Sequence, residues 1–187
     1  MNFVNAAHVH LLLNHIPVAG IILALILLVM ARSRRSAEIE MAALAVLVLI
    51  ALVAIPTYLT GEPAEEVVER LPGVSEDIAK WHEDVAKFAL GGALLVGLAA
   101  LAGLRQWRAR GAVSVRLSNL ALGLTLVVCA IFGYTAYSGG QVHHAELRSD
   151  FVVPEDDDAE EGAEAGEAQP YPQPEADDDS TSGGGGG

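Results

Sequence analysis

The chain carries six histidines, and their spacing could support cofactor or metal chemistry. They are His8, His10, His15, His82, His143 and His144. Imidazole binds haem iron and also suits copper and zinc. On one helix, His8 and His15 would share a face but lie roughly 10 Å apart along the axis. A ligand pair for one metal ion therefore has to come from two different helices.

The favoured ligands are His15 and His82, which are both expected to face the interior of a helical bundle. His144 or His143 could replace one of them, or could form a second site with His8. A b-type haem needs two imidazoles on facing helices and a slot walled by small residues. The same histidines could instead bind a bare transition metal or only form hydrogen bonds. His8 and His10, near the terminus, are expected to be interfacial anchors and not ligands.

Four apolar runs must position these histidines, and each is long enough to cross a bilayer. About 20 helical residues span the roughly 30 Å of hydrocarbon. Helices are expected because a backbone in lipid must satisfy its own hydrogen bonds. The sequence thus predicts an all-α integral membrane protein, a four-helix transmembrane bundle over residues 1–148. The expected spans are about 11–31, 41–59, 85–104 and 117–137.

Charged loops predict how this bundle is oriented. Three arginines follow the first run and four lie between the third and fourth runs, so both loops fall on one side. The positive-inside rule makes that side cytoplasmic, in a bacterial inner membrane. Both termini, the 60–84 connection and every histidine then lie on the periplasmic side.

The 60–84 connection has predicted structure of its own. Gly61 and Pro63 should end the second helix, and 64–71 reads as a short amphipathic helix. Ser75 is a candidate N-cap for a helix that runs directly into the third span. In the fourth span, Gly139 and Gly140 are expected to break the helix before His143.

Residues 149–187 differ in composition from the rest of the chain. From 150 onward there are thirteen acids and no lysine or arginine, whereas residues 1–149 hold eleven acids and eleven bases. Such a segment cannot bury enough apolar area to fold, so a disordered acidic tail is predicted. The absence of a basic surface argues against nucleic acid as a partner.

The segment from His8 to Gly20 resembles the opening of a family of bacterial predicted membrane proteins catalogued as a domain of unknown function. Its members run from a histidine-rich segment into His-Phe-Pro or a close variant, and their fourth span ends in Gly-Gly followed by histidine. Here Ile16 replaces the aromatic residue. The resemblance covers about residues 8–148 and implies four spans. A haem-binding role suspected for such histidine sets would fall on His15, His82 and His144.

The functional hypothesis is a membrane protein that binds haem b at the outer face and transfers electrons, without being an enzyme by itself. Its expected partners are the lipid bilayer, other respiratory or redox membrane proteins, and a second copy of itself. One alternative is a non-enzymatic scaffold or accessory subunit whose acidic tail binds a basic partner. Another is a membrane protein that binds a transition metal.

Overall fold

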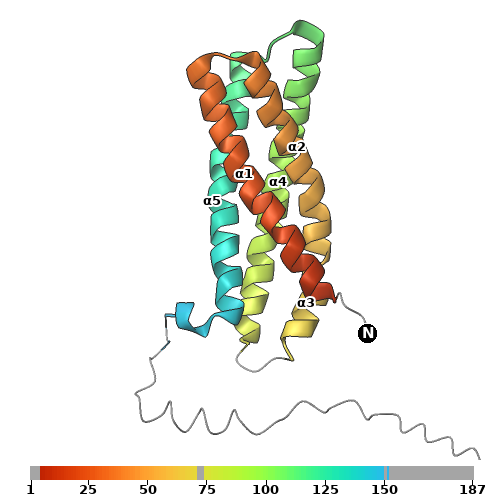
Figure 1. The fold of residues 1–187 in the computed structure, drawn as a ribbon, viewed down its shortest axis with the longest axis vertical. Coiled ribbons are helices and arrows are strands. Elements are labelled where there is room, and N and C mark those ends of the chain that lie inside the picture. Colours follow the sequence, from red (N-terminus) through yellow and green to blue (C-terminus); the bar gives the residue numbers. More distant parts are fainter. Residues whose placement is uncertain (1–4, 71–73, 150, 152–187) are drawn as a thin grey trace, which may run out of the picture. The chain divides into compact units, whose positions relative to one another are not determined.

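The computed structural model describes residues 5–70, 74–149 and 151, which fold into helices (Figure 1). A short helix, α3, precedes the third long helix, and a 3-10 turn, η1, follows the last one. Within the described residues there is no strand, so the predicted all-α four-helix architecture is confirmed. The elements are α1 (Ala6–Arg34), α2 (Ala37–Leu59), α3 (Gly61–Val68), α4 (Glu76–Arg110), α5 (Val115–His143) and η1 (Ala145–Leu147).

The four long helices of the described chain are long and apolar enough to cross a membrane. Even α2, the shortest with 23 residues, extends over about 35 Å at the usual helical rise. Each helix begins before the span predicted for it. The helices α1, α4 and α5 also end beyond their spans, whereas α2 ends at Leu59 as predicted. The predicted acidic tail, apart from residues 149 and 151, lies outside the described residues.

The long helices pack in the ring order α1, α2, α4, α5, and α5 returns to α1 (Figure 1). Small side chains let α2 and α4 approach closely, since Ala93 and Ala100 are fully buried and a Cβ on Gly97 would overlap that of Ala51. Small interfacial residues are typical of membrane helices. The contact between α1 and α5 is the least extensive of the four.

The single cysteine of the chain, Cys129, lies on α5 and packs half-buried against the hydrophobic core. It has the surroundings of a small apolar side chain, as is usual for a free cysteine.

The start of α4 agrees with its prediction. The helix begins after Ser75 and runs without a break to Arg110, although the Ser75 side chain makes no capping hydrogen bond. Two charged pairs four residues apart lie on its exposed face. Glu76 pairs with Lys80 at 3.8 Å, and Glu83 pairs with Lys87 at 3.2 Å.

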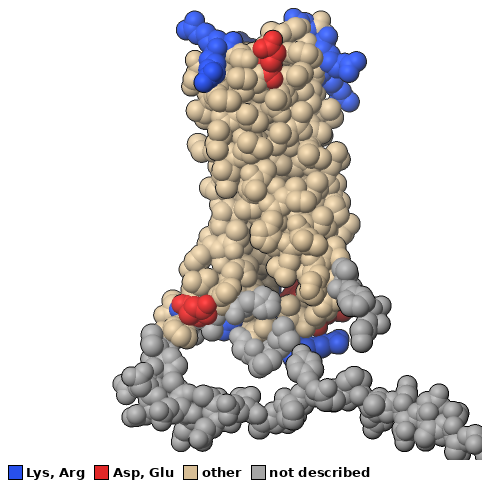
Figure 2. Space-filling model, viewed as in Figure 1, with Lys and Arg blue, Asp and Glu red and all other residues tan. Residues whose placement is uncertain are grey.

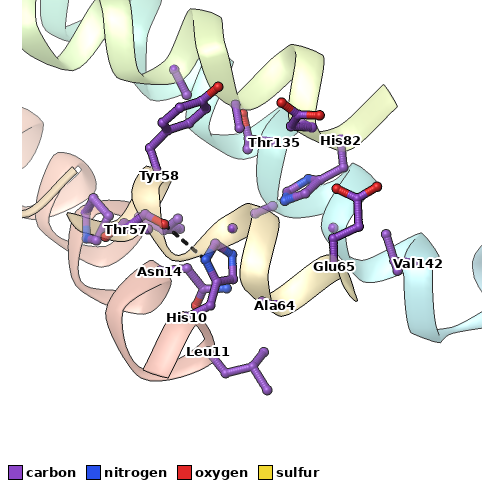
Figure 3. Close-up of a pocket in the computed structure, with 18 of the residues that line it drawn as sticks. His10, Leu11, Asn14, Thr57, Tyr58, Ala64, Glu65, His82, Thr135 and Val142 are labelled. Carbon is purple, nitrogen blue, oxygen red and sulfur yellow. Dashed lines mark hydrogen bonds between the residues drawn. The ribbon is translucent and has the colours of Figure 1, made fainter. Parts of the chain in front are cut away.

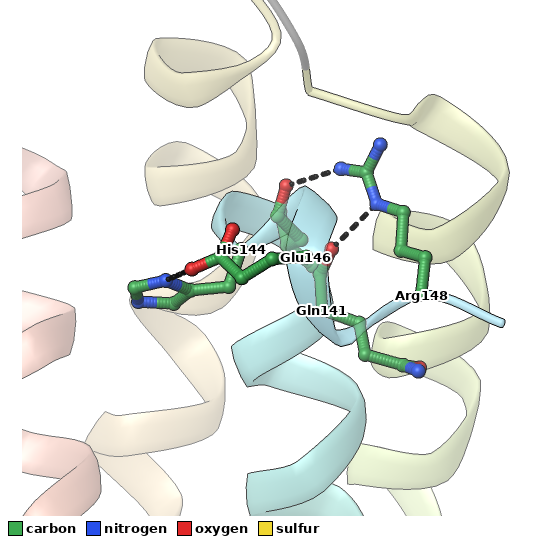
Figure 4. Close-up of polar contacts among 5 residues, drawn as sticks. Gln141, His144, Glu146 and Arg148 are labelled. Carbon is green, nitrogen blue, oxygen red and sulfur yellow. Dashed lines mark hydrogen bonds and ion pairs between the residues drawn. The ribbon is translucent and has the colours of Figure 1, made fainter. Parts of the chain in front are cut away.

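The expected break at Gly139 and Gly140 is wrong, because α5 continues through both glycines to His143. Arg148 folds back over this end and donates hydrogen bonds of 3.0 Å to the backbone carbonyls of Gln141 and Val142 (Figure 4). The last carbonyls of a helix have no partner within the helix. The guanidinium supplies those partners and so stabilises the final turn.

Charged side chains gather at the two ends of the bundle and leave its middle bare (Figure 2). The turns that join α1 to α2 and α4 to α5 lie together at one end. They carry the seven arginines that the sequence analysis assigned to one side. We call this end, with Arg32, Arg34, Arg35, Arg105, Arg108, Arg110 and Arg116, the arginine end.

Candidate cofactor pocket

A cavity of about 530 Å³ lies at the end of the bundle opposite the arginine end (Figure 3). Residues from α1, α2, α3, α4 and α5 line it, together with His144. Much of the wall is apolar, with Ala54, Ala89 and Phe132 among the lining side chains. Small-molecule and cofactor sites typically measure about 300–1,000 Å³ and are mostly apolar with a few polar groups.

His10 on α1 points its ring into this cavity (Figure 3). The Nδ1 atom lies 3.0 Å from the backbone carbonyl of Thr57 and 3.3 Å from the hydroxyl of Thr60. A carbonyl can only accept, so Nδ1 must carry the hydrogen and donate it. In the neutral ring, Nε2 then keeps a free lone pair for a ligand.

His82 on α4 points into the cavity from another side (Figure 3). The Ser138 hydroxyl donates to the Thr135 carbonyl at 3.0 Å. Its single hydrogen is thereby used, so it accepts a 3.0 Å hydrogen bond from Nδ1 of His82. The Nε2 atom of a neutral His82 also keeps its lone pair. Partners of this kind fix the orientation of metal-bound histidines.

Gly139 on α5 makes room for the His82 ring. A Cβ built on this glycine would lie 2.9 Å from Cε1 and 3.2 Å from Nδ1 of the imidazole. Non-bonded carbon atoms normally approach no closer than about 3.5 Å. Position 139 therefore has to lack a side chain if His82 keeps this position.

The faces of α1 explain why His10 turns inward. His10 is followed at intervals of seven by Pro17, Ala24 and Ala31, and these three are all buried. Residues seven apart lie near one face of a helix. The same face thus carries both the interhelical contact and His10.

His15 lies on a different face of α1, and the expectation that it points inward is wrong. Its side chain is exposed, as are Ile22 and Val29, which follow it at intervals of seven. Its Nδ1 atom contacts the Leu11 carbonyl, one turn back in the same helix. His15 lines the edge of the cavity but does not share the interior position of His10.

The interior position predicted for His82 is confirmed by the buried stripe that continues from it along α4. Ala89, Val96 and Gly103 follow at intervals of seven, and all are buried. The histidines that face each other across the cavity are therefore His10 and His82, each at the end of the buried stripe of its helix.

The remaining candidates lie at the rim or beyond it. His144 is exposed and its Nδ1 atom lies 2.8 Å from the Glu146 carboxylate (Figure 4). The pKa of Glu146 is lowered by a hydrogen bond from its own backbone N–H and by the contact with His144. His143 is the last residue of α5, and its side chain lies outside the described part. His8 is exposed and bonded to Asn5.

Two further polar groups face the cavity. Glu65 on α3 is half-buried and points toward the same space as His82 (Figure 3). Asn14 also lines the cavity, and its Oδ1 atom is buried without a hydrogen-bond partner. Together with the two Nε2 atoms, the Glu65 carboxylate and the Oδ1 atom of Asn14 give the cavity several hydrogen-bond acceptors.

Among the described residues, no group of three or more His, Cys, Asp or Glu side chains is placed to hold a metal ion. Protein sites for zinc use three or four such ligands. The pair of His10 and His82 has too few ligands for a bare ion of that kind. A haem iron could be held by two histidines, because the porphyrin would supply its remaining ligands.

The fold and the cavity define a multi-pass helical membrane protein with a histidine-lined pocket at one end of its bundle. A comparison of the chain with protein-family models, curated proteins and solved structures finds no match.

Sequence reasoning missed His10, Ser138 and Gly139. The stripe of Pro17, Ala24 and Ala31, seven residues apart, was the available signal for His10, since small residues mark interhelical faces. No comparable signal identifies Ser138 and Gly139, because their role depends on the position of α4 against α5.

Proposed function

We propose that this protein binds a b-type haem in the cavity, through Nε2 of His10 and of His82, and serves as an electron carrier. The observation that carries the proposal is the tautomer of the two imidazole rings, which is the same in both. Each Nδ1 donates to an oxygen within the bundle, and neither Nε2 has a hydrogen-bond partner among the described residues. Both rings line the same cavity. This tautomer is the one in which imidazole ligates through Nε2.

The surroundings of the rings fit the group. The cavity has the volume of a cofactor site, and Gly139 opens the space beside His82. A bound haem would supply one-electron chemistry at its iron. The protein would hold the group through the two histidine rings, with Thr57 orienting His10 and Ser138 orienting His82, and the apolar wall would exclude water.

The proposed location is the outer face of a bacterial cytoplasmic membrane. Under the positive-inside rule the arginine end is cytoplasmic, so the cavity and both termini belong to the periplasmic side. A haem protein without further catalytic groups would act together with other respiratory or redox membrane proteins, and not as an enzyme by itself.

The test is a reduced-minus-oxidised visible spectrum of the purified full chain. Sharp haem bands are expected in the wild type and should vanish in His10→Ala and in His82→Ala. His15→Ala is the matched control, since it removes an imidazole from the edge of the cavity, and its bands should persist.

Other outcomes separate the rival functions. A colourless protein with bound copper or zinc by elemental analysis would contradict the haem proposal and favour a metal-binding protein. A colourless, metal-free protein would favour the scaffold or accessory subunit. Bands that disappear in His15→Ala and in His82→Ala but persist in His10→Ala would instead support the ligand pair expected from the sequence.

A further inference from the structure

The arginine end is strongly positive, and few acidic side chains lie near its arginines to neutralise them. All seven of its arginines are exposed. The acids in the same two turns and adjoining helix ends are Glu38 and Glu40, so seven positive and two negative charges leave a net charge of +5. None of these arginines takes part in an ion pair among the described residues.

The positions of these charges follow two junctions of the bundle. Three arginines surround the turn from α1 to α2, and four surround the turn from α4 to α5. Arg32 on α1 bonds to the Asn119 side chain on α5, which ties the two groups together across the least extensive helix contact. The charge therefore forms one field at this end and not two separate patches.

The acidic tail of the chain cannot neutralise that field once the helices span a bilayer. The 29 residues of α5 extend over about 43 Å and carry the chain to the other end of the bundle. The thirteen acids from position 150 onward come after this end of α5 in the sequence. A counter-charge for the arginine end has to come from another molecule.

Apolar surface continues from the arginine end along α1 and α5. Ile26 and Val29 of α1 are 56% and 51% exposed, and Leu120 and Leu126 of α5 are 52% and 60% exposed. A ligand that matches both surfaces has an anionic head and long apolar chains. Soluble anions match only the first, and neutral lipids only the second.

We propose that the arginine end binds anionic phospholipids, with the phosphate groups on the arginines and the acyl chains against the exposed faces of α1 and α5. Basic residues at a bilayer surface attract anionic lipids with an energy that corresponds to about a fivefold change in affinity for each residue. This inference concerns the opposite end of the bundle and does not depend on the proposed haem.

The experiment titrates the full chain, purified in neutral detergent, with phosphatidylglycerol and separately with phosphatidylcholine, and counts bound lipids by native mass spectrometry. Wild type should retain phosphatidylglycerol in preference to phosphatidylcholine. The triple variant Arg108→Gln/Arg110→Gln/Arg116→Gln should bind phosphatidylglycerol about fivefold more weakly for each arginine removed. The matched control, Arg70→Gln/Lys80→Gln/Lys87→Gln, removes three positive charges from the other end and should bind as wild type does.

Two additions keep the test decisive. Replacing Arg108, Arg110 and Arg116 by lysine should preserve binding within a fewfold, which separates loss of charge from loss of fold. Equal binding in wild type and the glutamine variant, or an equal loss in the control, would overturn the proposal. So would displacement of the lipid by inorganic phosphate, because the site would then bind phosphate without the acyl chains.

Discussion

At the scale of single residues, one position beside the cavity is constrained because it has no side chain. Gly139 lies so close to the His82 ring that any Cβ there requires a shift of the imidazole or of α5. Its position beside Gly140 near the end of the fourth span predicts a break in the helix. In the folded bundle it is instead a site of close approach between two helices.

Gly139→Ala should therefore displace His82 and weaken or abolish the haem bands. Overpacking of this kind also costs about 1–3 kcal/mol of stability, which a lower melting temperature would report. The neighbouring Gly140→Ala is the control, since its Cβ would meet only Leu147 at an ordinary 3.6 Å. Unchanged bands in Gly139→Ala would show that His82 does not occupy this position when ligated.

Ser138→Ala should leave Nδ1 of His82 without its acceptor. Loss of such an outer partner typically costs about 10–100-fold in metal affinity, so haem retention should fall by that order. Thr125→Ala is the control, because it removes another buried hydroxyl from α5, one that bonds to the Ala121 carbonyl far from the cavity. Equal haem affinity in Ser138→Ala and wild type would contradict the assigned role.

At the rim, His144→Ala should raise the pKa of Glu146 toward its ordinary value, because one of the contacts that lower it disappears. A carboxylate with a lowered pKa stabilises the folded turn above its unfolded pKa, and that contribution is lost as the pH falls through the folded pKa. Wild type should thus hold this turn to lower pH than His144→Ala. A carboxyl titration followed by NMR would show it, and identical titrations would rule out the contact.

The choice of His15 over His10 shows what the sequence could and could not predict about the site. All histidines could be assigned to one end, because depth follows from residue counts along each helix. The facing residue could not be chosen safely, since α1 is apolar on all sides. Only the spacing of small residues, Pro17, Ala24 and Ala31, separates its buried face from its exposed one.

At the scale of the helices, the existence and order of the four spans were predictable. The end of α2 at Leu59 and the start of α4 after Ser75 were predictable too, whereas the end of α5 was not. Length and hydropathy alone identify a membrane helix. The end of α5, however, depends on Arg148, which donates to its last turn from five residues beyond His143. This contact forms only after the chain has turned back on α5, so no local sequence pattern predicts it.

The close approach of α2 and α4 leads to a prediction about stability. Gly97→Ala would place a methyl group against Ala51 and should separate the two helices, at a cost of about 1–3 kcal/mol. Gly91→Ala on the same helix meets no atom within 4 Å and should be neutral or stabilise by up to about 1 kcal/mol through helix propensity. Melting temperatures in detergent compare them, and equal melting temperatures would contradict the packing described for Gly97.

At the scale of the whole molecule, the separation of charge predicts topology. In a Cys129→Ala background, a cysteine introduced at Ser75 should react in intact cells with a membrane-impermeant maleimide. A cysteine at Ser114 should react only after the cells are opened. Ser75 lies at the end of the bundle that holds the cavity, and Ser114 lies at the arginine end. The reverse pattern would invert the proposed orientation and place the cavity on the cytoplasmic side.

Cys129 is the single cysteine of the chain, and its thiol can serve as a chemical probe of the folded bundle. Cys129 stands at the midpoint of α5, fourteen residues from either end of the Val115–His143 helix, and therefore near the centre of the hydrocarbon layer. Water-soluble alkylating reagents are excluded from that layer, so they reach the half-buried thiol only when α5 leaves its place in the bilayer. The unmodified protein thus contains a reporter of its own unfolding, and its rate of alkylation measures how often α5 leaves the membrane.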